Sequence, residues 1–115
     1  MVSKKYVPDR GDLVWVDLNP TKGREQSKTR PALVISPKSY NQKTNLAIMC
    51  PVTSAQKGYP FEVAVKDKKV AGVILSDHVR SLDWKSRNVK FITRAKPVVF
   101  QEVQTKLLLL IDYKK

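Results

Sequence analysis

Two charged residues stand five positions apart in a polar stretch near the start of the chain, Glu25 and Arg30. A carboxylate can accept the proton of an attacking hydroxyl, and a guanidinium can hold two phosphate oxygens in a bidentate fork. The pair therefore suits transesterification of RNA, in which the 2'-hydroxyl is the nucleophile and the protein supplies a proton acceptor and cations. A surface ion pair is the structural alternative for a Glu and an Arg in one loop.

Thr53 stands at the end of an apolar run, and its hydroxyl could donate a hydrogen bond to a non-bridging phosphate oxygen. Its alternative is an ordinary β-branched strand residue. The only histidine, His78, cannot form a two-histidine acid-base pair within one chain. The sequence has no His/Cys cluster, no Gly-rich phosphate motif and no closely spaced set of carboxylates. We therefore expect a reaction without a metal ion or other cofactor.

The charge of the chain indicates a polyanionic partner. The 115 residues include 22 Lys and Arg against 10 Asp and Glu, a formal charge of +12. Such a surface attracts phosphate backbones, acidic lipids and acidic protein segments alike. The N-terminus has no apolar segment behind its charges, and the longest aliphatic run, 107–111, is short. We expect a cytoplasmic protein with no membrane segment, in which the single Cys50 is inert packing.

The apolar pattern predicts several short strands that are separated by turn residues. A polar turn is expected at 39–45 and a hairpin turn at 66–69. The predicted strands are 13–18, 31–36, 46–53, 61–65, 70–75, 79–84 and 89–93.

Pro97 suits the first turn of a helix, and apolar residues then recur every three or four positions. The stripe consists of Phe100, Val103, Leu107, Leu110 and Ile111. Leu108 and Leu109 lie off it, so this helix could pack on two surfaces, one of them a subunit interface. The expected fold is a single domain, 1–115, that is mainly β with a C-terminal α-helix and forms a small, strongly bent antiparallel sheet or barrel.

Five motifs follow one another in the order of a known family. They are G-D-L-V-W-V-D at 11–17, P-T-K-G-x-E-Q at 20–26, R-P-A-L-V-I-S-P at 30–37, C-P-V-T-S at 50–54 and K-G-Y-P-F-E-V at 57–63. Together they make the chain resemble the MazF/PemK toxins of type II toxin-antitoxin modules, closely over 2–84 and more loosely from Lys85 onward.

The resemblance implies an SH3-like barrel that forms a homodimer. It implies a sequence-specific, metal-independent endoribonuclease, or mRNA interferase, which cuts single-stranded RNA and leaves a 2',3'-cyclic phosphate and a 5'-hydroxyl. Arg30 and Thr53 fall on the family's catalytic arginine and threonine, and Glu25 falls on its loop glutamate. A cognate acidic antitoxin of the MazE/PemI type would cover the groove.

Two positions depart from the family pattern. Ser54 stands where some relatives carry a second threonine, and His78 stands where relatives typically have glutamine. His78 could keep the hydrogen bonds of glutamine, add a titratable group beside the groove, or be structural. Because a guanidinium releases its proton reluctantly, Arg30 is expected to act by electrostatics rather than as a simple general acid.

We expect RNA contacts from a set of polar residues around this site. They are Gln26, Lys28, Ser54, Lys57, Tyr59, Asp77, His78 and Arg80. Trp15, Tyr59 and Trp84 could stack on unpaired bases, although a core position is favoured for Trp15 because valines surround it.

Two alternatives come from other functional classes. A CcdB-like toxin that binds DNA gyrase without catalysis could share the fold. Such toxins depend on a tryptophan-containing tail, whereas this chain ends Ile111-Asp112-Tyr113-Lys114-Lys115. A nucleic-acid-binding module without catalysis would fit the charge but would leave the match at Glu25, Arg30 and Thr53 unexplained.

Overall fold

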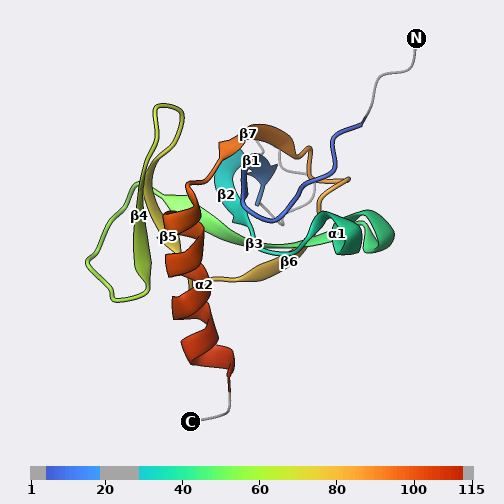
Figure 1. Cartoon of the computed structure of the whole chain (residues 1–115). Helices are drawn as coiled ribbons and strands as arrows, with labels where there is room; N and C mark the ends of the chain where they lie inside the picture. The colour runs from blue at the N-terminus through green and yellow to red at the C-terminus, as the bar shows by residue number, and fades with distance from the viewer. Residues whose placement is uncertain (1–4, 19–28, 113–115) are drawn as a thin grey trace.

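The computed structural model describes residues 5–18 and 29–112. These residues form seven strands and two helices (Figure 1). The elements are β1 (Asp12–Asp17), β2 (Thr29–Val34), α1 (Lys38–Thr44), β3 (Leu46–Thr53), β4 (Glu62–Lys66), β5 (Ala71–Leu75), β6 (Arg80–Asp83), β7 (Lys90–Arg94) and α2 (Pro97–Ile111).

The strands form one curled antiparallel sheet in the order β4-β5-β3-β2-β1-β7. β3 is its centre because it pairs with β2 on one edge and with both β5 and β6 on the other. The C-terminal end of β3 pairs with β5, and its N-terminal half pairs with β6. This confirms the predicted bent antiparallel sheet with a closing helix, and the strand limits differ from the predicted ones by only one or two residues.

The sheet buries apolar side chains on both faces, which explains why its strands are apolar in long runs rather than in strict alternation. Leu13 and Leu33 belong to one core, which α2 covers through Val99, Phe100 and Val103. Residues that alternate with Leu13 and Leu33 along the same strands face the other side of the sheet, where they form a second core with Trp84. Its other members are Val14, Val16, Ala32, Val34, Ala47, Met49 and Leu82.

Helix α2 begins at Pro97 as predicted, but only part of its predicted apolar stripe is buried. Val103 and Leu107 are buried, whereas Leu110 and Ile111 are 52% and 63% exposed. The C-terminal end of α2 projects beyond the sheet, and no described residue covers these two side chains (Figure 1).

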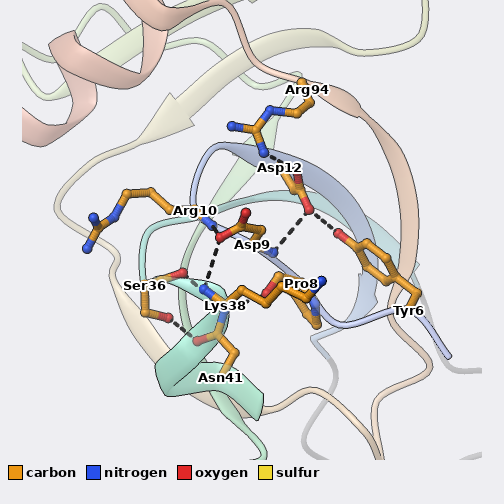
Figure 2. A network of polar contacts seen from close by, with 9 residues as sticks. All are labelled: Tyr6, Pro8, Asp9, Arg10, Asp12, Ser36, Lys38, Asn41 and Arg94. Carbon is orange, nitrogen blue, oxygen red and sulfur yellow. Dashed lines mark hydrogen bonds and ion pairs between the residues drawn. The ribbon is translucent and has the colours of Figure 1, made fainter. Parts of the chain in front are cut away.

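The prediction of a polar turn at 39–45 is wrong, because Lys38–Thr44 is helix α1. Its sequence has no apolar stripe. Instead, the fully buried Asn41 side chain donates to the carbonyls of Pro8 and Ser36, and its Oδ1 accepts a bond from the Ser36 hydroxyl (Figure 2). Asn45 ends the helix with a left-handed φ of 62°, a conformation that asparagine tolerates.

A second polar network ties the N-terminal segment to the sheet. The buried Asp12 carboxylate accepts bonds from the Tyr6 hydroxyl, the Asp9 amide and the Arg94 guanidinium (Figure 2). Burial and the hydrogen bond of its hydroxyl to Asp12 raise the pKa of Tyr6 far above its ordinary value. The predicted hairpin turn at 66–69 is confirmed, since the Asp67 amide donates to the Val70 carbonyl. No helix of the described segments is long and apolar enough to span a lipid bilayer.

Candidate active site

Arg30 and Thr53 come from neighbouring strands and stand at the same end of the pair. β2 pairs with β3 through Ala32 opposite Pro51. Arg30 lies two residues before Ala32, and Thr53 lies two residues after Pro51, so in this antiparallel pair both stand at the same end. Because side chains alternate along a strand, Arg30 shares a face with Ala32, and Thr53 shares a face with Pro51. The fold therefore brings these two predicted catalytic residues to one end of one sheet face.

The Thr53 side chain has a defined orientation. Its Oγ1 accepts a hydrogen bond of 3.1 Å from the Ala55 amide. The hydroxyl hydrogen is not used in that bond, so it is available to a phosphate oxygen. Arg30 is exposed, and its partner across β1 is Val16. Together the two side chains offer a cation and a neutral donor at one end of the β2–β3 pair.

Gly72 of β5 lies directly against the backbone of Thr53. Its φ is +148°, and a Cβ at this position would come within 2.5 Å of the Thr53 carbonyl oxygen. The neighbouring residue Val73 is the paired partner of Thr53. A glycine is therefore required here for β5 to approach β3 closely enough to hold Thr53.

The loop after Thr53 carries three of the predicted RNA contacts. Ser54, Lys57 and Tyr59 are all exposed, and Tyr59 is 60% exposed. The Glu62 carboxylate accepts bonds from the amides of Lys57 (3.0 Å) and Gly58 (2.9 Å), which fixes the loop. The sequence reasoning missed Glu62, because its role arises from loop contacts that only the fold creates.

Asp77 and His78 lie in the turn between β5 and β6, the two strands that pair with the edge of β3 opposite to β2. The His78 Nε2 lies 4.0 Å from the Asp77 Oδ1, and both side chains are exposed. Within the described residues, no polar contact joins His78 to Arg30 or Thr53. The RNA contact of His78 stays a prediction.

Arg80 and Arg87 hold the end of β1. The Nη1 atom of Arg80 donates to the Leu18 carbonyl (3.3 Å), and that of Arg87 donates to the Asp17 carbonyl (3.0 Å). The Asp17 amide in turn donates to the Arg87 carbonyl. These contacts fix the chain where it leaves the sheet, a role that the sequence did not predict. The RNA contact of Arg80 stays a prediction.

Three of the predicted site residues, Glu25, Gln26 and Lys28, lie outside the described residues. Among those described, no group of three or more His, Cys, Asp and Glu side chains is arranged to hold a metal ion. Burial raises the pKa of the Cys50 thiol to about 12, which fits the predicted inert core cysteine.

The predictions for the two tryptophans are wrong. Trp15 was expected in the core but is 38% exposed, because it lies beyond the part of β1 that α2 covers. Trp84 was a candidate for base stacking but is only 8% exposed, and its Nε1 donates to the Asn41 carbonyl. The indole of Trp84 is thus part of the core, while Trp15 and Tyr59 present aromatic surface.

Comparison with known proteins places this arrangement in a family. Residues 9–111 match the family model of the PemK-like, MazF-like toxin of type II toxin-antitoxin systems. The endoribonuclease toxin MazF of Escherichia coli K12 is 46% identical, with 96% of this chain and 99% of that protein aligned. The endoribonuclease PemK of Escherichia coli is 32% identical over 93% of this chain and 84% of its own length.

Solved structures agree with the sequence matches. A crystal structure of MazF from Deinococcus radiodurans is 50% identical, covers 94% of this chain and 99% of its own, and has a TM-score of 0.85. A MazE-MazF crystal structure from the same organism is 50% identical, covers 96% and 100%, and has a TM-score of 0.88. An endoribonuclease from a mycobacterial species, at 18% identity and a TM-score of 0.75, shares the fold. By sequence and by structure, the chain belongs to the PemK/MazF family of toxins of type II toxin-antitoxin systems.

Proposed function

We propose that the protein is a sequence-specific endoribonuclease toxin that cuts single-stranded RNA without a metal ion. The observation that carries the proposal is the placement of Arg30 and Thr53 at one end of one sheet face. The relative from Escherichia coli, which is named an endoribonuclease toxin, supports the reaction class. The formal charge of +12 supports a polyanionic substrate.

In the proposed reaction, the substrate supplies its own nucleophile. Glu25 accepts the proton of the 2'-hydroxyl while the 2'-oxygen attacks phosphorus, and the bond from phosphorus to the 5'-oxygen breaks. The products are a 2',3'-cyclic phosphate and a 5'-hydroxyl. Arg30 stabilises the charge that develops on the phosphorane, and Thr53 donates its hydroxyl hydrogen to a non-bridging oxygen. Since Arg30 is exposed, water in the groove can supply the proton that the leaving oxygen requires.

Base recognition is assigned to the groups around these two residues. Tyr59 offers an exposed ring on a loop that Glu62 fixes, so a base can stack on it at low entropic cost. Ser54 and Lys57 stand on the same loop, and His78 and Asp77 stand at the next corner of the β3 edge. Gln26 and Lys28 are proposed as further RNA contacts.

We further propose two protein partners for this single toxin domain, 1–115, in the cytoplasm. The first is a second copy of the chain, because Leu108, Leu109, Leu110 and Ile111 leave an apolar surface on α2. The second is an acidic antitoxin whose charge complements the basic surface. MazE-MazF complexes from Deinococcus radiodurans support this partner.

The test is cleavage of a long single-stranded RNA by purified protein in EDTA, with the cut sites mapped. Wild type is expected to give discrete cuts, and Arg30→Ala is expected to lose them. Lys69→Ala is the matched control, because it removes an equal charge from the exposed hairpin turn after β4. Cleavage that needs added metal would contradict the proposal. A folded wild type that cuts nothing would redirect the search to protein targets such as DNA gyrase.

A further inference from the structure

A cavity of about 430 Å³ lies where the N-terminal segment, α1 and the turn after β6 meet. Three lysines from these three segments line it: Lys5, Lys38 and Lys85. The amide side chains of Gln42 and Asn45 contribute further polar groups, and the indole of Trp84 forms an apolar wall. None of the proposed catalytic or base-recognition residues borders this cavity.

The positive charge of the cavity is only partly offset within the described part of the chain. None of the three lysines forms an ion pair there. The two nearby carboxylates are engaged with backbone amides. Asp9 accepts bonds from the amides of Arg10 and Lys38, and Asp83 accepts bonds from those of Lys85 and Ser86. These bonds leave both carboxylates negatively charged, but the three ammonium groups outnumber them, so a net positive charge remains to attract an external anion.

The cavity lies at the opposite end of the sheet from the candidate active site. Ala47 and Thr53 are on the same face of β3, and Ala47 packs with Trp84 in the second core. They are six positions apart along the strand, a distance of roughly 20 Å. In Figure 1, α1 lies at the right of the view, and β4, β5 and α2 lie at the left.

We propose that this cavity is a second RNA-binding site, which holds phosphates of the single strand several nucleotides from the bond that is cut. The proposal rests on the proposed function, because it places the cut at Arg30 and Thr53. RNA is favoured over an acidic protein segment because the strand held at Arg30 and Thr53 in the proposed reaction continues beyond the cut bond. It offers a phosphate at each nucleotide to the lysines and base edges to the amides of Gln42 and Asn45.

The experiment compares two substrates. One is the shortest oligonucleotide that wild type cuts, and the other is the same sequence extended on its 5' or its 3' side. The variant is Lys38→Gln with Lys85→Gln. The matched control is Lys68→Gln with Lys69→Gln, which removes the same charge from the exposed hairpin turn.

For wild type, we expect a lower KM on the RNA extended toward the cavity than on the short oligonucleotide. In the Lys38/Lys85 variant this advantage shrinks roughly tenfold, because two phosphate contacts are lost. In the same variant, the slope of the logarithm of the RNA association constant against the logarithm of the salt concentration becomes shallower by roughly 1.4. This corresponds to about 0.7 for each lost phosphate contact of a single strand. The control variant is expected to keep the advantage and the steeper dependence.

Three results would overturn the proposal. The first is an unchanged advantage in the Lys38/Lys85 variant, and the second is an equal loss in the control. The third is a polyglutamate peptide that binds wild type and not the variant, while both bind RNA equally. If wild type cuts neither RNA, the proposed function fails. Fluorescence anisotropy of the intact extended RNA with both variants then still decides whether the cavity binds it.

Discussion

Gly72→Ala should lower the rate of RNA cleavage because the added methyl group displaces Thr53, although Thr53 itself is unchanged. The added Cβ would lie 2.5 Å from the Thr53 carbonyl oxygen and 3.1 Å from its carbonyl carbon. Ordinary contact begins near 3.4 Å, so β5 or the end of β3 must move by about 0.9 Å. Both sides of the contact are backbone, and no flexible side chain can absorb the shift.

A misplacement of about 1 Å can reduce the rate of a positioned reaction by about 10²-fold. We expect a loss of about this size in kcat/KM for Gly72→Ala on a fluorogenic RNA, with most of it in kcat. Ala71→Ser is the control, since it adds one atom at the exposed neighbouring residue of the same strand. Urea unfolding of each variant separates lost activity from a smaller folded fraction, because strain at this site also costs about 1–3 kcal/mol of stability.

A double-mutant cycle shows whether Gly72 acts through Thr53. In a Thr53→Ala background the hydroxyl is already gone, so Gly72→Ala should cost much less than in wild type. Equal costs in both backgrounds would refute the reasoning. So would a Gly72→Ala protein with activity within about threefold of wild type, since the shift worked from the structure predicts about 10².

Three other predictions concern titratable side chains. Because the pKa of Tyr6 is raised from 10.0 by burial and by its bond to Asp12, the stability linked to it is complete below pH 10 and falls above it. Tyr6→Phe should be less stable at neutral pH and lose stability less steeply above pH 10 in urea titrations. The Cys50 thiol, with its pKa raised to about 12, should resist iodoacetamide at pH 8 until the protein is unfolded, and rapid labelling of folded protein would contradict the packing. His78→Gln should change the preferred cut sequence or the pH-rate profile, because an imidazole can ionise and an amide cannot; an unchanged cut map and profile would assign His78 a structural role.

The strands and the closing helix could be predicted because their signals are local. Apolar runs between Gly, Pro and polar residues mark β1 to β7, and Pro97 marks the start of α2. Helix α1 could not be predicted in this way. Its stability depends on Asn41, whose bonds reach Pro8 and Ser36, and contacts between distant residues leave no periodic pattern.

In the candidate site, too, local sequence signals identified some residues, whereas residues that act through contacts made by the fold were missed. Arg30 and Thr53 were identified by motif, and the register of β2 and β3 explains how they come together. The supporting residues were missed, because the roles of Glu62 and Gly72 arise from loop and strand contacts that only the fold creates. Trp15 was misplaced for a similar reason, since α2 covers only part of β1.

The central claim, cleavage through the substrate's own 2'-hydroxyl, is tested most directly by removing that hydroxyl. We would compare an RNA that contains a mapped cut site with the same RNA carrying one 2'-deoxynucleotide on the 5' side of the cut bond, in EDTA. The account predicts that the RNA is cut to a 2',3'-cyclic phosphate and a 5'-hydroxyl, while the substituted strand is bound but stays intact. Cleavage of the substituted strand at the same bond would contradict it.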